Sequence, residues 1–323
     1  MRVIVAIFAV IVFFCNAENI KAYGSNPVLT NMIYLLNPQS LIGFNYKPYQ
    51  EDLEFMDKKI HNLPILGGFM NGAQTNIETL IKLKPQVVFT SGSGIISDFE
   101  KQLQKLNIRT INLKVSNLNE MLDSLLIMGE ELNRKQKAQD LKKWIENNIK
   151  VLKEIPQNRP LIYFAQGVDG LQSFCVDRGK SDLAKIIGGE NIIKCDNNKN
   201  SRININPEQL LKAQPDIIFV REVAMFRELK ENPKGFWTSL NAVKNKKIFY
   251  APSSPSNWLH RPPSLMQGLG LRWAFDVVKN ADFFAKEEIP LDEYNKNAIK
   301  EFYSLFLGIK LDDNDLKKLF KIK

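Results

Sequence analysis

A short loop near residue 260 combines three side chains that together suit the binding of a metal complex. The loop reads Trp258-Leu259-His260-Arg261 and is followed by two prolines. A neutral imidazole can complete the coordination of a metal, an indole can stack on a planar chelator, and a guanidinium can pair with carboxylates or catecholates. The loop therefore predicts a ligand contact with His260 as a candidate metal ligand; the alternative is a loop histidine bonded to backbone.

The histidine content argues against a site for a bare metal ion. A site for Zn²⁺ or Mn²⁺ assembles several His and carboxylate ligands, whereas His61 and His260 are the two histidines of the chain. His61 lies in a polar loop, where a structural role is expected. A metal is therefore expected to reach this protein already held by a chelator.

Arginine is concentrated in the second half of the chain. The stretch 18–125 holds only Arg109, whereas seven arginines lie beyond residue 156, namely Arg159, Arg178, Arg202, Arg221, Arg227, Arg261 and Arg272. An anionic ligand held mainly by the second half would explain this distribution, which is also compatible with chance.

An eighteen-residue phrase occurs twice, 130 positions apart. Thr75–Gly92 reads TNIETLIKLKPQVVFTSG, and Ile205–Glu222 reads INPEQLLKAQPDIIFVRE. In each copy an Asn is placed to cap a helix, a Glu in the first turn suits the helix dipole, and a Pro ends the helix before a buried strand. Two copies at so long a spacing predict two lobes built alike, with the function between them.

Short apolar strands alternate with amphipathic helices in both halves. The strands are predicted at Ile20–Tyr23, Leu41–Phe44, Gln86–Thr90, Arg109–Leu113, Leu161–Gln166, Ser173–Val176 and Ile248–Ala251. This alternation predicts an α/β fold of two similar lobes, each a mostly parallel sheet flanked by helices. We place the N-terminal lobe at 18–125, a helical connector at 126–156, and the C-terminal lobe with two closing helices at 157–323.

The connector is predicted to be one long helix. Apolar residues in Lys135–Ile155 recur close to helical spacing. Twenty-one helical residues would extend about 30 Å, enough to reach from one lobe to the other and to limit hinge motion.

The first residues are typical of a secretory signal peptide. The run Val3–Phe14 is apolar throughout, follows Arg2, and leads to Cys15-Asn16-Ala17, which suits cleavage after Ala17. Residues 1–17 are therefore expected to be removed, leaving a protein exported to the periplasm. Cys15 also raises a lipoprotein interpretation, but the bulky Phe14 stands where lipoprotein processing requires a small residue.

The charge and the remaining cysteines bound the function further. The 44 basic and 35 acidic residues give a formal net charge of +9, and because both signs are interspersed, a solvated surface is favoured over nucleic-acid binding. Cys175 and Cys195 would remain after signal removal. In an oxidising compartment such a pair can form a disulfide, which we favour over a metal site.

Several phrases, taken in order, resemble the periplasmic substrate-binding proteins of ABC importers, in the class that takes up iron-siderophores, haem, cobalamin and related metal chelates. They include Leu66-Gly67-Gly68, Gly188-Gly189-Glu190-Asn191, Asn206-Pro207-Glu208, Gln214-Pro215-Asp216 and Phe236-Trp237. The resemblance covers essentially the whole mature chain. It implies a class III periplasmic binding protein, a monomer without enzymatic activity or a permanently bound cofactor, whose partners are a metal chelate and an ABC permease at the inner membrane.

The resemblance gives the repeated glutamates a role. In that family this glutamate lies on the outer rim of each lobe and meets arginines of the permease, which implies that Glu78 and Glu208 are the docking pair. A first-turn helix glutamate would explain one copy equally well, but not both copies at matching positions.

The ligand contacts are expected where parallel strands end, since ligands gather at the carboxyl ends of such strands. Arg202 precedes Glu208 where the family places a cleft residue, and Phe69 or Met70 could fill the matching place before Glu78. The candidate contacts are Tyr23, Phe69 and Ser91 from the first lobe, and Arg202, Arg221, Trp258, His260 and Arg261 from the second.

A ferric siderophore is the first ligand predicted, on its prevalence in the family. A nickel complex with small carboxylate chelators, such as histidine, would use the same groups in a smaller pocket, and haem or cobalamin is a further alternative. A sensory receptor without a transporter would look the same in sequence. The rival from another class is an exported α/β hydrolase, but Ser93 within Gly92-Ser93-Gly94 lacks the spacing of a nucleophile elbow.

Overall fold

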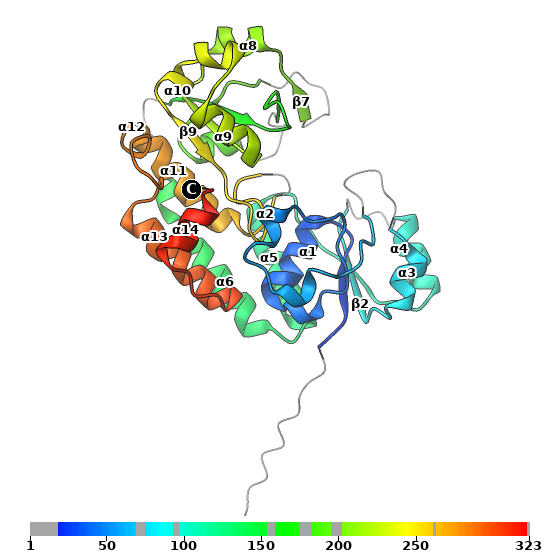
Figure 1. Ribbon diagram of the computed structural model, residues 1–323. Helices are drawn as coiled ribbons and strands as arrows, with labels where there is room; N and C mark the ends of the chain where they lie inside the picture. Colours follow the sequence, from blue (N-terminus) through cyan, green and yellow to red (C-terminus); the bar gives the residue numbers. More distant parts are fainter. Residues whose placement is uncertain are drawn as a thin grey trace, which may run out of the picture.

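The structure of the chain is a computed structural model, and it describes residues 19–68, 75–92, 97–153, 159–174, 182–194, 202–260 and 263–321. Figure 1 shows two lobes, with strand β2 and helices α1 to α4 in the lower one and helices α8 to α10 in the upper one. The predicted signal peptide, residues 1–17, lies outside the described residues.

The first lobe is built on a parallel sheet in the order β1-β2-β3. Its elements are β1 (Ala22–Gly24), α1 (Pro27–Leu36), α2 (Gln50–Leu53), α3 (Ile77–Lys82), β2 (Val87–Thr90), α4 (Asp98–Lys105) and β3 (Thr110–Asn112). The predicted strand Leu41–Phe44 is reduced to two isolated bridges, Leu41 with Ala22 and Phe44 with Ile65. Because the segment pairs with two different neighbours, it forms no continuous ladder.

The second lobe is built on a parallel sheet in the order β6-β4-β8-β9. Its elements up to β9 are β4 (Leu161–Ala165), β5 (Gln172–Phe174), α7 (Leu183–Ile186), β6 (Glu190–Asn191), β7 (Arg202–Asn204), α8 (Pro207–Ala213), β8 (Ile217–Val220), α9 (Val223–Glu231), α10 (Asn241–Lys244) and β9 (Ile248–Tyr250). The strand predicted near Ser173 is β5, but it pairs antiparallel with β7 in a small separate sheet.

Side chains of the two main sheets alternate between an inner and an outer face. In the first sheet Val87 and Phe89 join a large core cluster, whereas Val88 packs outward with α3 and α4. In the second sheet Phe219 joins the same large cluster, whereas Ile218 packs outward with α8 to α10. Each sheet is thus covered on both faces, and the inner faces share one continuous core.

The helix predicted from Lys135 to Ile155 begins at Lys135 but ends at Asn148, so its predicted length is corrected. Helices α5 (Leu118–Glu131) and α6 (Lys135–Asn148) pack side by side, and a 3-10 turn at Lys150–Lys153 follows. The chain reverses at Asn133, which adopts a φ of 55°. The lobe boundary predicted after residue 125 falls inside α5.

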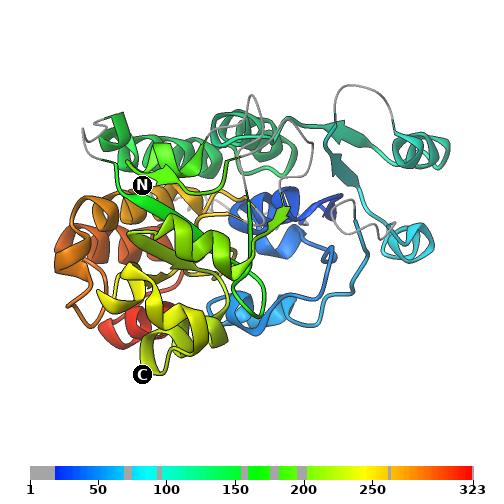
Figure 2. The ribbon, with the colours of Figure 1, turned by 90° about the horizontal axis from the view of Figure 1, so that it is seen from above.

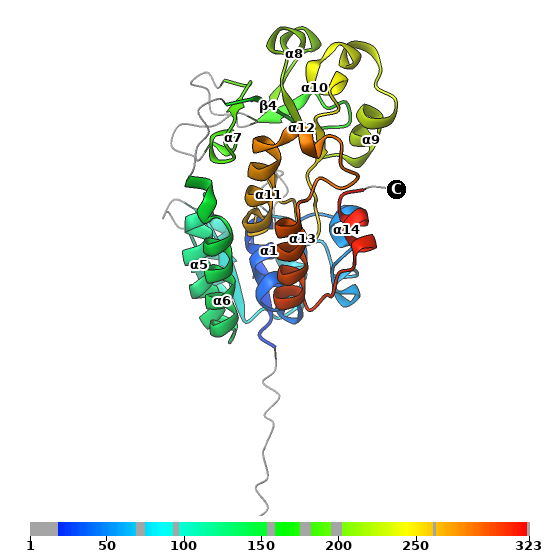
Figure 3. The ribbon, with the colours of Figure 1, turned by 90° about the vertical axis from the view of Figure 1, so that its left-hand side faces the viewer.

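The C-terminal helices close the molecule beside the connector. They are α11 (Gln267–Lys279), α12 (Ala281–Phe284), α13 (Glu293–Phe302) and α14 (Asp313–Leu319), and the last two are the closing helices that the sequence predicts. Helix α6 packs against α11 and α11 against α13, as Figure 3 shows from the side. Seen from above in Figure 2, the orange helices α11 to α13 and the cyan α3 and α4 lie at opposite ends of the molecule.

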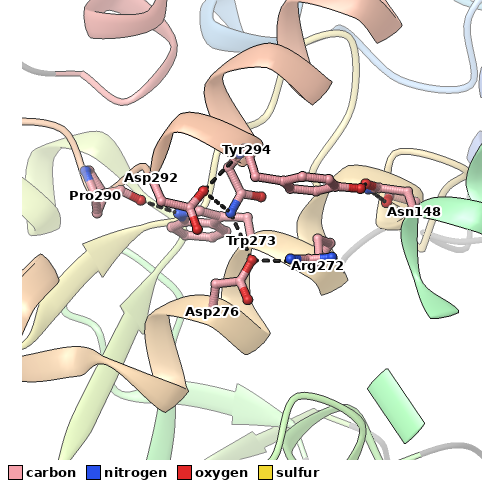
Figure 4. A network of polar contacts seen from close by, with 9 residues as sticks. Asn148, Arg272, Trp273, Asp276, Pro290, Asp292 and Tyr294 are labelled. Carbon is pink, nitrogen blue, oxygen red and sulfur yellow. Dashed lines mark hydrogen bonds and ion pairs between the residues drawn. The ribbon is translucent and has the colours of Figure 1, made fainter. Parts of the chain in front are cut away.

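A partly buried network of polar contacts fixes the connector to the C-terminal helices (Figure 4). Asp276 of α11 accepts hydrogen bonds from Arg272 Nε at 2.7 Å and from Asn295 Nδ2 of α13 at 2.8 Å. The Tyr294 hydroxyl donates to Asn148 Oδ1 at the end of α6, at 2.7 Å. Because a hydrogen-bonded network inside a core has a defined geometry, it holds α6, α11 and α13 in one arrangement.

Candidate functional site

The residues that follow the parallel strands lie at one edge of each sheet. In the second lobe Arg221 follows β8, and its N–H donates to the carbonyl of Ala165 at the end of β4, at 3.1 Å. In the first lobe Ser91 follows β2, and its hydroxyl accepts from Asn26 Nδ2 at 2.6 Å. Both strand ends therefore present polar groups, as the fold predicts.

Arg221 lies where the two lobes meet. Its guanidinium is 3.0 Å from Glu222 Oε1 and lies over the ring of Tyr49 from the first lobe, with 4.8 Å to the ring centroid. Burial opposes the charge on Arg221, but Glu222 and its other neighbours hold the pKa of Arg221 above its ordinary value. A charged guanidinium thus faces the segment 46–53 of the first lobe.

A hollow of about 430 Å³, part of it open to solvent, lies beside this contact. Its described lining combines α1, the segment 44–56 and the loop after β9: Pro27, Thr30, Asn31, Tyr34, Phe44, Asn45, Tyr46, Pro48, Asp52, Met56, Pro255 and Ser256. Its enclosed part is only about 40 Å³, far below the range of small-molecule pockets, so it has room for a small group rather than for a whole ligand. We call it the α1 hollow.

Helix α2 is anchored to the second lobe at the wall of the hollow. The hydroxyl of Ser254 donates to the carbonyl of Asp52 at 2.9 Å and accepts from the N–H of Phe55 at 3.1 Å. Burial raises the pKa of the Asp52 carboxyl to about 7, against the lowering effect of Arg221. A carboxyl that changes charge near neutral pH therefore lies at the junction of the lobes.

His260 packs against an aromatic side chain of the small antiparallel sheet. Its ring lies 4.1 Å from that of Phe174, centroid to centroid, and its backbone N–H donates to Asn257 Oδ1 at 2.8 Å. The strand residue opposite Phe174 is Arg202, of which the structure describes the backbone alone. The structure therefore brings the chain at two predicted contacts, His260 and Arg202, into one region of the second lobe.

Two other predicted contacts have no exposed surface for a ligand. Tyr23 is fully buried, with its hydroxyl donating to the carbonyl of Gly67 and accepting from Asn45 Nδ2 at 3.1 Å. Trp258 is also fully buried, and its Nε1 donates to the carbonyl of Ser254 at 3.1 Å. Both side chains are packed in the core, so neither lies at a surface that a ligand could contact.

Several predicted residues lie outside the described part of the chain. Among the ligand contacts these are Phe69 and Arg261, and among the cysteines they are Cys15, Cys175 and Cys195. The disulfide between Cys175 and Cys195 therefore stays a prediction.

The repeated glutamates occupy matching exposed positions. Glu78 lies in the first turn of α3, which Asn76 caps by accepting from the N–H of Thr79 at 3.0 Å. Glu208 lies in the first turn of α8, which Asn206 caps by accepting from the N–H of Gln209 at 2.8 Å. The repeat in the sequence is therefore a repeat in the structure.

Sequence reasoning missed the two polar residues that α1 and α2 contribute to the hollow, Asn31 and Asp52. Both lie on helices, away from the strand ends that guided the prediction. One signal was available for Asn31: it is a polar residue inside Pro27–Leu36, a helix whose residues are all buried. A buried amide on such a helix is expected to have a hydrogen-bond partner, in the protein or in a ligand.

Metal and membrane features were sought in the same ranges. Among the described residues, no group of three or more His, Cys, Asp or Glu side chains is placed to hold a metal ion. Within those ranges, too, no helix has the length and apolar character needed to span a bilayer.

Comparison with known proteins places this architecture in a family. Residues 50–255 match the profile described as periplasmic binding protein. The high-affinity heme uptake system protein IsdE of Staphylococcus aureus is 32% identical over 192 residues, which cover 54% of this chain and 63% of IsdE. The chain thus matches less than two thirds of that relative's length.

Solved structures agree over nearly the whole chain. An ABC transporter solute binding protein from Sulfurospirillum deleyianum superposes with a TM-score of 0.81 at 27% identity, covering 94% of this chain and 95% of that one. The apo heme-binding protein RhuT from Roseiflexus has the same fold, with a TM-score of 0.60 at 16% identity and coverage of 82% and 99%. The resemblance found in the sequence is confirmed, and the chain belongs to the periplasmic binding protein family.

Proposed function

We propose that this protein captures a metal chelate between its two lobes in the periplasm, with a ferric siderophore as the first candidate, and delivers it to an ABC permease. The observation that carries the proposal is the position of Arg221. A half-buried guanidinium at the end of a parallel strand lies directly over a ring of the opposite lobe. An anionic chelate that entered there would contact both lobes and a fixed positive charge.

The family supports binding rather than catalysis. Periplasmic binding proteins are solute-binding components of transport systems, and the site combines one arginine with tyrosines, amides and the buried carboxyl of Asp52. Such a set recognises charge and shape. The hydrolase alternative rested on Ser93, which lies outside the described residues, and has no support from the family.

Haem is the second candidate, and His260 is the residue that favours it. The imidazole is half-buried against Phe174, and imidazole is a common axial ligand of haem iron. The relative that is 32% identical is named for haem uptake. A siderophore with an open iron position would use the same side chain.

Tryptophan fluorescence titration tests the proposal with ferric siderophores, haemin and nickel plus histidine. We expect His260→Ala to weaken binding of the metal-loaded chelator much more than binding of the metal-free chelator, because only the metal-loaded form offers a coordination position for the imidazole. His61→Ala, which changes the other histidine, is the matched control and should leave affinity within about twofold.

The ligand that binds decides between the candidates. Binding of haemin alone would promote haem over a siderophore, and binding of nickel-histidine alone would promote nickel. If none of these complexes binds to the wild-type protein, the proposed function is wrong.

A further inference from the structure

The α1 hollow is lined by a carboxyl group, an amide and several aromatic rings. Asp52 and Asn31 line it together with Tyr34, Phe44 and Tyr46, and none of the described lining residues is Lys or Arg. Aromatic faces and carboxylate oxygens both attract a positively charged group. The lining therefore has the chemistry of a site for a cation rather than for an anion.

Asn31 supplies the first independent sign of a missing partner. The residue is 6% exposed, and its Oδ1 is buried without a hydrogen-bond partner in the described part of the chain. Leaving such an acceptor unpaired costs about 1–3 kcal/mol. Because this oxygen has less than 1 Å² of accessible surface, a donor in the hollow would recover this free energy only after the amide turned toward it.

Asp52 supplies the second sign. Its side chain is 6% exposed, and one carboxyl oxygen accepts a single long hydrogen bond from the N–H of Tyr49, at 3.3 Å. Burial raises its pKa to about 7, although Arg221 and Lys321 lower it, while Glu51 raises it further. Both cations already have carboxylate partners, Glu222 for Arg221 and Glu54 for Lys321. A cation placed in the hollow would stabilise the ionised form of Asp52.

We propose that the α1 hollow is a subsite for a protonated primary amine, held by Asp52 and Asn31 and by the rings around them. The subsite deepens the proposed function, on which it rests: it selects metal chelates that carry a pendant ammonium group. Arg221, outside the hollow, would meet the anionic part of the same ligand. A free alkyl amine has the same chemistry and is separated from a chelate by the experiment.

A matched pair of iron complexes tests the subsite. Ferrioxamine B carries one free ammonium group on its trihydroxamate chain, and its N-acetyl derivative keeps the iron centre but loses the charge. Isothermal titration calorimetry should show N-acetylation weakening binding to the wild-type protein by roughly 10- to 150-fold, the range expected for a charged hydrogen bond. Asp52→Asn should reduce that difference to about twofold.

Glu51→Gln is the control, because it removes the neighbouring carboxylate of α2, which does not line the hollow. This variant should keep the discrimination of the wild type. A third titration uses 1,5-diaminopentane alone, whose binding by the wild type and loss in Asp52→Asn would support the subsite without any chelate.

The outcomes separate the subsite from the proposed function. Equal affinity of the wild type for the two iron complexes overturns the amine subsite and leaves chelate binding intact. If the diamine binds and no metal complex does, the subsite stands and the proposed function falls. If neither ferrioxamine B nor the diamine binds, the subsite is wrong.

Discussion

The two copies of the repeated phrase form the same frame and end in different chemistry. Both begin with an asparagine cap and an exposed glutamate, and both helices end at a residue with positive φ before a proline, Lys84 at 53° and Gln214 at 44°. A four-residue buried strand follows in each copy. The frame is therefore set by local sequence rules that act equally in both lobes.

The difference lies in the residue pair that follows each strand. In the first lobe Ser91 carries a hydroxyl bonded to Asn26, whereas in the second lobe Arg221 and Glu222 form an ion pair. The same backbone thus presents a neutral polar group after the strand of the first lobe and charges after the strand of the second. A repeated scaffold fixes where a site lies, and the residues after its strands decide what it binds.

The largest expected effect tests whether the two copies act as a pair. Reversing both Glu78 and Glu208 to Lys should abolish uptake by cells, because both lobes would present the wrong charge to the permease, while affinity in solution stays within about threefold. Each single reversal should reduce uptake in part. The control is Glu228→Lys, an exposed glutamate outside the repeat, which should transport normally. Normal uptake by the double variant would remove the docking assignment.

The next effect tests the difference between the strand ends. Arg221→Ala should weaken chelate binding by about 2–5 kcal/mol, or roughly 30- to 4,000-fold, because the charge is partly desolvated and faces both lobes. Ser91→Ala should stay within about tenfold, the range of a neutral hydrogen bond. Titration of both variants with one ferric siderophore measures the contrast. Equal losses would show that the charged side does not dominate.

A smaller effect concerns the junction of the lobes and depends on pH. Because the folded pKa of Asp52 is raised to about 7 from 3.8, its contribution to stability is fully present below about pH 4 and is lost as pH rises to about 7. One pKa unit corresponds to about 1.4 kcal/mol, so the loss is on the order of a few kcal/mol. The charged groups that shift this pKa, including Arg221, Lys321 and Glu51, are unchanged in Asp52→Asn, so this variant isolates the contribution of the carboxyl.

Urea unfolding at several pH values between 4 and 8 measures this contribution. The free energy of unfolding of the wild type should fall relative to that of Asp52→Asn as pH rises. Parallel pH profiles of the two proteins would show that Asp52 titrates near its ordinary value when folded.

The comparison also shows how much the sequence can predict. Caps, helix ends and buried strands depend on neighbours within a few residues, so both copies of the repeat were predicted from composition and spacing. The position of Arg221 at the end of a strand was predicted as well, since the direction of that strand in a parallel sheet is fixed, whereas its contact with a ligand stays a prediction. The α/β fold of two lobes, a class III periplasmic binding protein, is likewise confirmed.

Side-chain direction and long-range packing explain the rest. Tyr23 follows the rule for strand ends but packs with Val88 in the outer core, because alternation along β1 turns it to the outer face of the sheet. Asn31 and Asp52 enter the site through contacts between helices and a distant loop, which no local pattern encodes. The helix predicted in the connector was too long because apolar residues continue at helical spacing to Ile149 and Leu152, past the end of α6 at Asn148.

The smallest expected effect compares the two helix caps. Asn206 and Gln209 form a reciprocal pair on α8, since Asn206 Oδ1 accepts from the Gln209 N–H at 2.8 Å and Gln209 Oε1 accepts from the Asn206 N–H at 2.9 Å. On α3, Asn76 Oδ1 accepts from the Thr79 N–H at 3.0 Å, and the Asn76 N–H donates to the Leu66 carbonyl at 2.7 Å instead.

Replacing either asparagine by alanine should therefore cost about 1 kcal/mol, the usual value for a lost N-cap. Gln209→Ala should cost about 0.5–1 kcal/mol more than Thr79→Ala, because it removes the returning hydrogen bond. Thr79→Ala removes no cap contact, since the backbone N–H of residue 79 remains. Urea unfolding of the four single variants measures all four costs. Equal costs for Gln209→Ala and Thr79→Ala would show that the reciprocal hydrogen bond contributes nothing to the free energy of unfolding. The two helix caps would then contribute equally to stability.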